Sequence, residues 1–306
     1  MSRRNESGQA IVLMVIALAV LTGMAALVLD VGIWMRTDRR LQATADAAAL
    51  AGAQKLPADV GGAKALAQTY ANQNGGDVLG SDITVTSTYN ANDTISVKAA
   101  KTEPGIFSKV LGINSASISA NAKARVDSPQ KARFVAPMVV SCDHALIKNC
   151  NGNHTPDFNQ DTTMDFDPMG APGAFGMLNL DGGSGTPGAS DEGNWILHGF
   201  DKYLDIGTYR SDPGAKFSSS NVSGALDDRI GTELLFPVFK TLTGTGQNAE
   251  YDIIGWIGFH LTAEVTHGNN ATLTGYFTQY IAQGILAAGG SGIPTTFGVS
   301  SVQLVG

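Results

Sequence analysis

The stretch that decides the fold is residues 11–56, IVLMVIALAVLTGMAALVLDVGIWMRTDRRLQATADAAALAGAQKL. An uncharged apolar run, residues 11–29, leads without a proline into an Ala-rich sequence that ends before Pro57. At ~1.5 Å of rise per residue the apolar run spans roughly 28 Å, close to the ~30 Å hydrocarbon core of a bilayer. Ala, Leu, Gln and Arg favour helix. The stretch therefore predicts one membrane-spanning helix that continues as a helical extension.

The apolar run is better suited to a retained anchor than to a cleaved signal peptide. A signal peptide has an apolar region of ~7–15 residues followed by a small-x-small cleavage site. Here the run is longer, bulky Ile33, Trp34 and Met35 follow it, and the nearest Ala-x-Ala begins at Ala43. Arginines flank both ends of the run, so their count does not set the orientation. A cleaved signal and a buried core helix are the alternatives.

Small side chains recur at helical spacing in the extension and form one stripe. Its members are Leu41, Ala45, Ala48, Ala49 and Gly52. Small residues let another element approach closely. The stripe is either a packing face inside this protein or a docking face for another subunit.

The same segment carries a family resemblance. Gly8 and Gln9, the end of the apolar run (AALVLDVG, residues 25–32) and RRLQATADAAALAGAQ (residues 39–54) occur in that order. They closely resemble the N-terminal segment of TadE/TadG-like proteins of bacterial tight-adherence (Flp) pilus-assembly systems. The resemblance implies a single-pass envelope protein with an exported C-terminal body, and it implies no known chemistry.

The composition favours an exported, β-rich body. The net charge is −7 with a sequence pI near 5.1, which disfavours nucleic acid as a partner because phosphate binding requires a basic surface. Charged residues make up only 15% of the chain while glycine numbers 37, as in exported proteins with many turns. The aromatic and β-branched residues are too frequent and too regularly placed for disorder.

After the anchor, the pattern predicts a small α/β unit, residues 57–131. We expect a helix, two strands in a hairpin, a short helix and a third strand. These elements cover residues 58–73, 83–87, 94–98, 104–112 and 116–126. Residues 127–131 are interpreted as a linker.

The remaining chain, residues 132–306, predicts a β-dominated domain with one short helix at residues 225–235. The expected strands are residues 134–140, 175–180, 238–243, 251–261, 271–283 and 297–304. The whole chain is therefore expected to be α+β, with residues 1–56 as the anchor and Ala-rich helix.

The chain has two cysteines, Cys142 and Cys150. In an oxidising compartment we expect a disulfide between them. A metal site with His144 and His154 is an alternative, although the spacing is not the short C-x-x-C of zinc modules. Two free thiols are the third possibility.

An acidic stretch supplies several oxygen ligands of the kind that calcium prefers. Its members are Asp157, Asn159, Asp161, Asp165 and Asp167. The EF-hand pattern fails, since Thr162 stands where Gly is needed and Pro168 where Glu is needed. We expect a solvated acidic loop, with weak binding of Ca²⁺ as the alternative and no other cofactor.

Enzyme signatures are poor. Ser184 and Ser291 lie among glycines, but neither completes Gly-x-Ser-x-Gly. The five histidines show no i, i+4 pair, and His260 is interpreted as a structural residue after an apolar strand. Asp191 and Glu192 would serve acid–base chemistry only in a cleft. We therefore expect no catalysis.

These observations lead to one expected function and two alternatives. We expect a non-catalytic, single-pass protein of a Tad-type pilus apparatus, with its body outside the cytoplasm. Its expected partners are the membrane, other pilus-apparatus proteins and cell-wall or surface material. The alternatives are a secreted, pilin-like filament subunit that packs through its N-terminal helix, and a membrane-anchored hydrolase or metal-dependent enzyme. Cleavage after Gly8 is not expected, because the fifth residue after that bond is Leu13 and not an acid.

Overall fold

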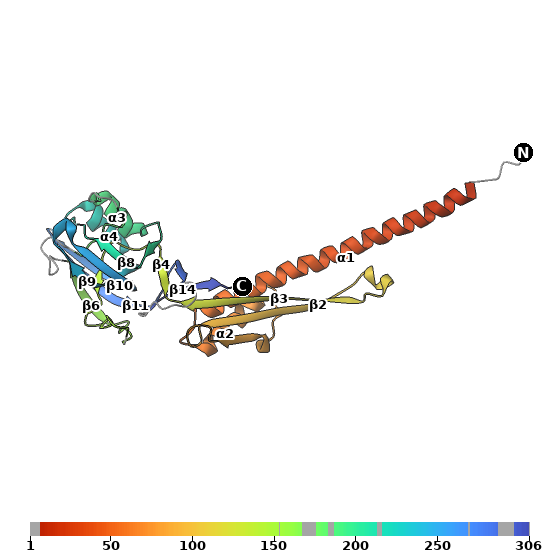
Figure 1. The fold of residues 1–306 in the computed structure, drawn as a ribbon, viewed down its shortest axis with the longest axis horizontal. Helices are drawn as coiled ribbons and strands as arrows, with labels where there is room; N and C mark the ends of the chain where they lie inside the picture. Colours follow the sequence, from red (N-terminus) through yellow and green to blue (C-terminus); the bar gives the residue numbers. More distant parts are fainter. Residues whose placement is uncertain are drawn as a thin grey trace, which may run out of the picture. The chain divides into compact units, whose positions relative to one another are not determined.

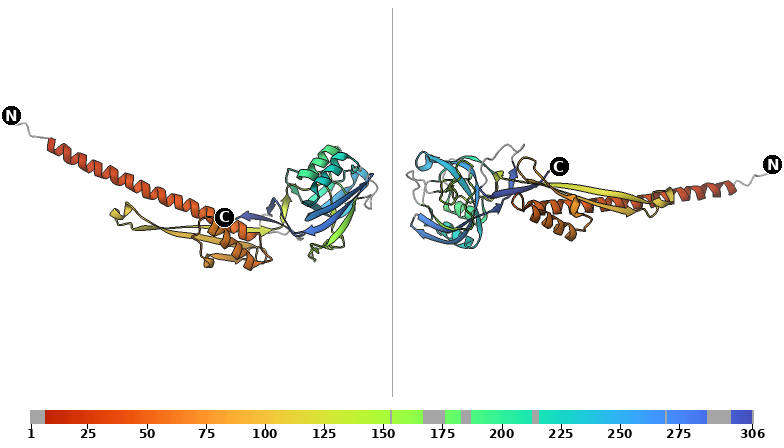
Figure 2. Two further views of the ribbon diagram at one scale, coloured as in Figure 1. Left: turned by 180° about the vertical axis from the view of Figure 1, so that it is seen from behind. Right: turned by 90° about the horizontal axis from the view of Figure 1, so that it is seen from below.

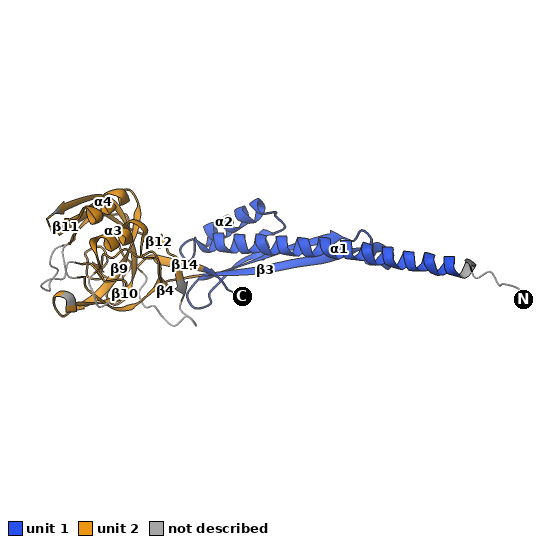
Figure 3. Ribbon diagram, turned by 90° about the horizontal axis from the view of Figure 1, so that it is seen from above, with its two compact units in different colours: residues 1–125, 303–306 blue, residues 126–302 orange. Residues whose placement is uncertain are grey.

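The computed structural model describes residues 7–152, 154–166, 176–182, 187–212, 216–268, 270–286 and 297–305. The chain forms two compact units (Figure 3). Unit 1 is Met1–Arg125 with Gln303–Gly306, and unit 2 is Val126–Val302. The expected α+β class is confirmed: a long apolar helix opens the chain, and strands dominate the C-terminal region.

Unit 1 begins with one continuous helix, α1 (Ser7–Ala53). Within the described residues it is the one helix long and apolar enough to cross a membrane, and its most apolar window is not buried by any other part of the chain. This bare half projects beyond the rest of unit 1 (Figures 1 and 2). The other half, from Asp30 onward, packs one face against the rest of unit 1 and is called the covered half below.

The small-residue stripe lies in the covered half of α1. Leu41, Ala45, Ala48 and Ala49 are fully buried, and this half of α1 packs on α2 (Val60–Gln73) and on the sheet. The stripe is therefore an internal packing face, the first of the two alternatives.

The sheet of unit 1 contains β1 (Ile83–Thr86), β2 (Thr94–Pro104) and β3 (Ser115–Asp127). β2 and β3 form a long antiparallel hairpin whose register runs from Thr94 opposite Arg125 to Pro104 opposite Ser115. A 3₁₀ turn, η1 (Gly80–Asp82), precedes β1. The expected order of elements is found, but the expected helix at residues 104–112 is only the 3₁₀ turn η2 (Ser108–Leu111).

Unit 2 is built on an antiparallel sheet with the order β5-β9-β10-β11-β6, in which the short edge strand β5 is parallel to β9 and β8 also pairs with β10. Its strands are β5 (Val140–Ser141), β6 (Asp161–Phe166), β8 (Gly207–Arg210), β9 (Glu233–Thr243), β10 (Glu250–His267) and β11 (Asn270–Thr278). The buried rings of Phe236, Phe259 and Phe277 pack in series in its core. Two helices, α3 (Ala189–His198) and α4 (Ser220–Arg229), pack on each other.

Short strands complete unit 2. β4 (Pro129–Ala132) lies between β13 (Gly284–Leu286) and β7 (Leu204–Asp205). β12 (Tyr280–Ile281) pairs in parallel with the start of β14 (Val299–Leu304), a strand whose residues from Gln303 onward belong to unit 1. A 3₁₀ turn, η3 (Gly246–Asn248), precedes β10.

Further local expectations differ from the structure. The described part of the strand expected at residues 175–180 makes only isolated bridges. The expected linker contains β4, because Lys131 and Ala132 pair with strands from distant parts of the chain. The expected strand at residues 134–140 makes isolated bridges and joins the large sheet only at its end. The expected helix at residues 225–235 ends at Arg229, because Gly231 adopts a positive φ of 82° and the chain then enters β9.

Candidate functional site

The covered half of α1 begins at Asp30, the first charged residue after the apolar run. Its side chain is almost fully buried. Oδ2 accepts hydrogen bonds from the backbone N–H groups of Ile106, Phe107 and Ser108, at 3.0, 2.9 and 2.7 Å. These three amides lie in the turn between β2 and β3, so one carboxylate holds the tip of the hairpin against α1.

The turn that Asp30 binds is tightly closed. The Gly105 N–H donates to the Asn114 carbonyl at 2.9 Å, and the Ile113 N–H donates to the Ser108 carbonyl at 3.1 Å. A Cβ at Gly105 would lie 2.7 Å from the Ile113 carbonyl oxygen, so the backbone approaches too closely for a side chain. Gly112 ends η2 with a φ of 83°, which glycine adopts without strain.

A second polar contact lies two helical turns further along the same face of α1. The Thr37 hydroxyl donates to Glu103 Oε1 at 3.1 Å, and Lys101 pairs with the same carboxylate at 2.9 Å. The hydrogen bond from Lys101 holds the pKa of Glu103 below its usual value. Asp30 and Thr37 therefore continue the buried stripe toward the apolar half of the helix.

The two cysteines are paired in unit 2. Cys142 and Cys150 form a disulfide with their Cα atoms 4.9 Å apart. Among the residues that the structure describes, one group of potential metal ligands clusters within 4.8 Å, and it consists of these two cysteines and Asp143. Their thiols are joined to each other and offer no thiolate to a metal.

The two neighbouring histidines make separate contacts. The His144 ring packs edge-on against Phe277, and burial lowers the pKa of His144. His154 contacts the Ile147 carbonyl oxygen through Nδ1, at 3.1 Å.

The acidic stretch is distributed along a loop and a strand. Asp161 and Asp165 both lie on exposed positions of β6, and the Thr272 hydroxyl donates to Asp165 at 2.7 Å. Four residues of strand separate their Cα atoms by ~13 Å, which is too far for both carboxylates to bind one ion. Asp157 and Asn159 precede β6 and are held through their backbone N–H groups, and Asp167 lies outside the described residues. The solvated acidic loop stays the prediction of the sequence, with weak calcium binding as its untested alternative.

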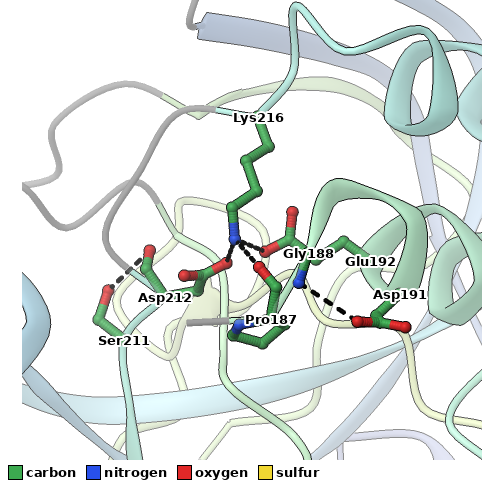
Figure 4. Close-up of polar contacts among 7 residues, drawn as sticks. All are labelled: Pro187, Gly188, Asp191, Glu192, Ser211, Asp212 and Lys216. Carbon is green, nitrogen blue, oxygen red and sulfur yellow. Dashed lines mark hydrogen bonds and ion pairs between the residues drawn. The ribbon is translucent and has the colours of Figure 1, made fainter. Parts of the chain in front are cut away.

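A buried ionic cluster, which sequence reasoning missed, lies between α3 and the segment before α4 (Figure 4). Lys216 donates to Glu192 at 3.0 Å, and also to Asp212 and to the Pro187 carbonyl oxygen. Both carboxylates are fully buried, while the lysine side chain is 19% exposed. Burial raises the pKa of Asp212, although Lys216 acts against that effect. The only sequence signal was two acids and a lysine within glycine-rich segments.

This cluster ties structural elements together. Glu192 lies on α3, which approaches α4 so closely that a Cβ at Gly193 would be 2.3 Å from the Asn221 carbonyl oxygen. Lys216 therefore connects the start of α3 to the segment that enters α4. Removal of one partner from such a buried ion pair destabilises the fold strongly, because the other charge is left buried without compensation.

Of the candidate catalytic residues, the structure describes His260, Asp191 and Glu192. His260 contacts Glu233 at 3.1 Å and stacks on Tyr276, so it has structural partners in the sheet. Ser184 and Ser291 lie outside the described residues. A cavity of about 380 Å³ beside α3 is lined by Asn194, His198 and neighbouring residues, but not by Glu192 or Asp191.

Comparison with known proteins assigns the N-terminal segment. No curated protein and no solved structure matches the chain. Residues 8–55 match the model of the Tad family, TadE/G-like proteins of Flp pilus assembly, which confirms the resemblance. This segment contains the apolar half of α1, Asp30 and the small-residue stripe. The chain therefore carries a TadE/G-like N-terminal segment on a helix able to span a membrane, as in a membrane-anchored protein related to pilus assembly.

Proposed function

We propose that this protein is a non-catalytic, single-pass envelope protein of a Tad-type pilus apparatus. The observation that carries the proposal is the division of α1 at Asp30. Before it, the helix is apolar and bare, as a lipid-embedded segment must be. After it, the same helix is the central packing element of unit 1. One helix thus joins the anchor to the folded body.

The body is proposed to lie outside the cytoplasm, where unit 2 contacts pilus components or cell-wall material. The Cys142–Cys150 disulfide supports this topology, because disulfides persist in oxidising compartments. The scattered histidines and the structural partners of His260 support a binding role over catalysis.

The bare half of α1 also favours a second candidate, a filament subunit whose helix packs with those of its neighbours. Such packing needs an acid that meets a neighbour's terminal amine in the apolar interior, since an unpaired buried charge is expensive. The first acid of α1 is Asp30, and its carboxylate already binds three amides of its own chain. The anchor role is therefore preferred.

Fractionation with intact-mass analysis separates the two candidates. For the anchor we expect the native protein in the membrane fraction after an alkaline carbonate wash, with a mass that includes residues before Gln9. A chain that begins at Gln9 and is recovered in sheared filaments would contradict the anchor role and favour the filament subunit.

A further inference from the structure

The tip of the β2–β3 hairpin carries an apolar patch that the chain leaves exposed. Its members are Ile106, Phe107, Val110, Leu111 and Ile113. Val110 is 89% exposed and Leu111 is 65% exposed. Five neighbouring apolar side chains on one turn are unusual for a protein surface in water and indicate that something covers them.

The position of this tip is fixed relative to the apolar half of α1. Asp30 directly follows the last residue of the apolar run, and its carboxylate holds the amides of residues 106–108 within 3.0 Å. Both elements belong to unit 1, and the bare helix continues past the tip (Figures 1 and 3). If residues 11–29 cross a bilayer, the tip reaches the surface of that bilayer.

The backbone of the tip suits a lipid environment. A segment at membrane depth must satisfy its polar groups internally. The Asp30 carboxylate accepts from residues 106–108, and the Val110, Gly112 and Ile113 N–H groups donate to carbonyls inside the turn.

The charge of the tip is also compatible with a membrane surface. Residues 104–115 contain no acid and one base, Lys109. A lysine beside apolar side chains can place its ammonium among anionic headgroups while its stem stays in the apolar layer.

We infer that the β2–β3 tip is a second membrane contact, which inserts its apolar side chains into the interfacial layer of the bilayer that α1 spans. The inference rests on the proposed anchoring by α1 and adds a contact to it. A bilayer is favoured over a protein partner because the patch lies beside the end of the apolar run, where Asp30 binds the tip. Two attachment points would also fix the rotation of unit 1 about the axis of α1.

Fluorescent probes on the full chain test this contact. The protein is placed one copy per nanodisc of phosphatidylethanolamine and phosphatidylglycerol, and a polarity-sensitive probe is attached to V110C. The native cysteines stay in their disulfide. We expect the emission to shift to shorter wavelength and the fluorescence to be lost when lipids spin-labelled near the headgroup are included.

Two further probes separate the inference from the anchor itself. A probe on M24C reports the spanning helix, and a probe on L79C reports an apolar residue that is 68% exposed elsewhere in unit 1. Quenching of the Met24 and Val110 probes without quenching of the Leu79 probe supports the inference. A quenched Met24 probe with an unquenched Val110 probe overturns it and leaves the anchor intact. An unquenched Met24 probe overturns both.

A protein partner gives a different result. If a second copy of this chain covers the tip, the emission of the Val110 probe shifts only in discs that hold two copies, and labelled lipid does not quench it. That result would also overturn the membrane contact.

Discussion

At the scale of single residues, two buried carboxylates organise unit 1 by accepting backbone hydrogen bonds. Asp30 binds three amides of the hairpin tip. Asp93 binds the amides of Thr88, Tyr89 and Asn90 at 2.7–2.9 Å and so closes the loop between β1 and β2. In both cases one acid replaces the hydrogen bonds that a tight turn cannot make within itself.

Replacing Asp30 is expected to release the hairpin tip. In D30A, amide hydrogen exchange at Ile106, Phe107 and Ser108 should accelerate by roughly tenfold or more, since a hydrogen bond to a charged group contributes about 1.5–3 kcal/mol. Mass spectrometry of the exchanged full chain measures this. D38A removes an exposed acid from the same helix and should leave these amides unchanged. Equal acceleration in both variants would contradict the role of Asp30.

Asp93 is expected to make stability depend on pH in the acid range. Burial alone would raise the pKa of Asp93, but the backbone hydrogen bonds to its carboxylate hold that pKa below its usual value. A folded pKa below the unfolded value of ~3.9 means that this contribution is fully present above pH ~4 and is lost as the pH falls through the folded pKa. In thermal unfolding in detergent, the midpoint temperature should therefore fall less steeply with decreasing pH for D93N than for the unsubstituted protein. Identical pH slopes would refute the assignment.

At the scale of elements, α1 is one continuous helix whose environment changes along its length. Its apolar half is exposed, while one face of its second half is buried in unit 1. Small residues at Ala45, Ala48, Ala49 and Gly52 let α2 and β2 approach the helix closely. The stripe is thus a device for packing a helix on its own sheet.

Gly52 tests the closeness of this packing. A Cβ there would lie 2.6 Å from Ile95 Cδ1 and 2.9 Å from the Ala63 carbonyl oxygen, so G52A should destabilise unit 1 by about 1–3 kcal/mol. A Cβ at Gly32, on the same helix, meets nothing within 4 Å. G32A should therefore be neutral or slightly stabilising, because alanine favours helix by up to ~1 kcal/mol over glycine. Denaturant unfolding should therefore show a lower free energy of unfolding for G52A and an unchanged or slightly higher one for G32A. An equal change in both variants would contradict the close packing at Gly52.

The ionic cluster is expected to stabilise the α3–α4 region of unit 2. K216M leaves Glu192 and Asp212 buried without their cation and should cost about 3 kcal/mol or more. K240M removes an exposed lysine from β9 and serves as the control. Denaturant titration of both variants measures the difference in the free energy of unfolding. A loss no larger for K216M than for K240M would show that the cluster contributes little.

The sequence predicted the elements whose signal is local. The length of the apolar run predicted α1, and alternation with turn residues predicted β1, β2 and β3. By contrast, α3 follows a glycine-rich stretch and was missed, and β4 was interpreted as a linker because its strand character comes from partners far along the chain. The clamp at Asp30 was also missed, since its partners are backbone amides more than seventy positions away. A lone acid at the end of an apolar run was the only available signal.

At the scale of the whole molecule, α1 is both the proposed anchor and the core helix of unit 1. Its sequence places the division at Asp30, and the family match covers both halves. The central claim is that the apolar run before Asp30 lies in the membrane, while unit 2 and the folded part of unit 1 after Asp30 lie outside the cytoplasm.

Protease protection in the native host tests this claim most directly. Protease added to spheroplasts with an intact cytoplasmic membrane should digest unit 2 and the part of unit 1 after Asp30, and should leave a small membrane-embedded fragment that contains the apolar half of α1. A cytoplasmic marker protein should stay intact in the same sample. Full protection of the chain in spheroplasts, with digestion only after lysis, would contradict the account.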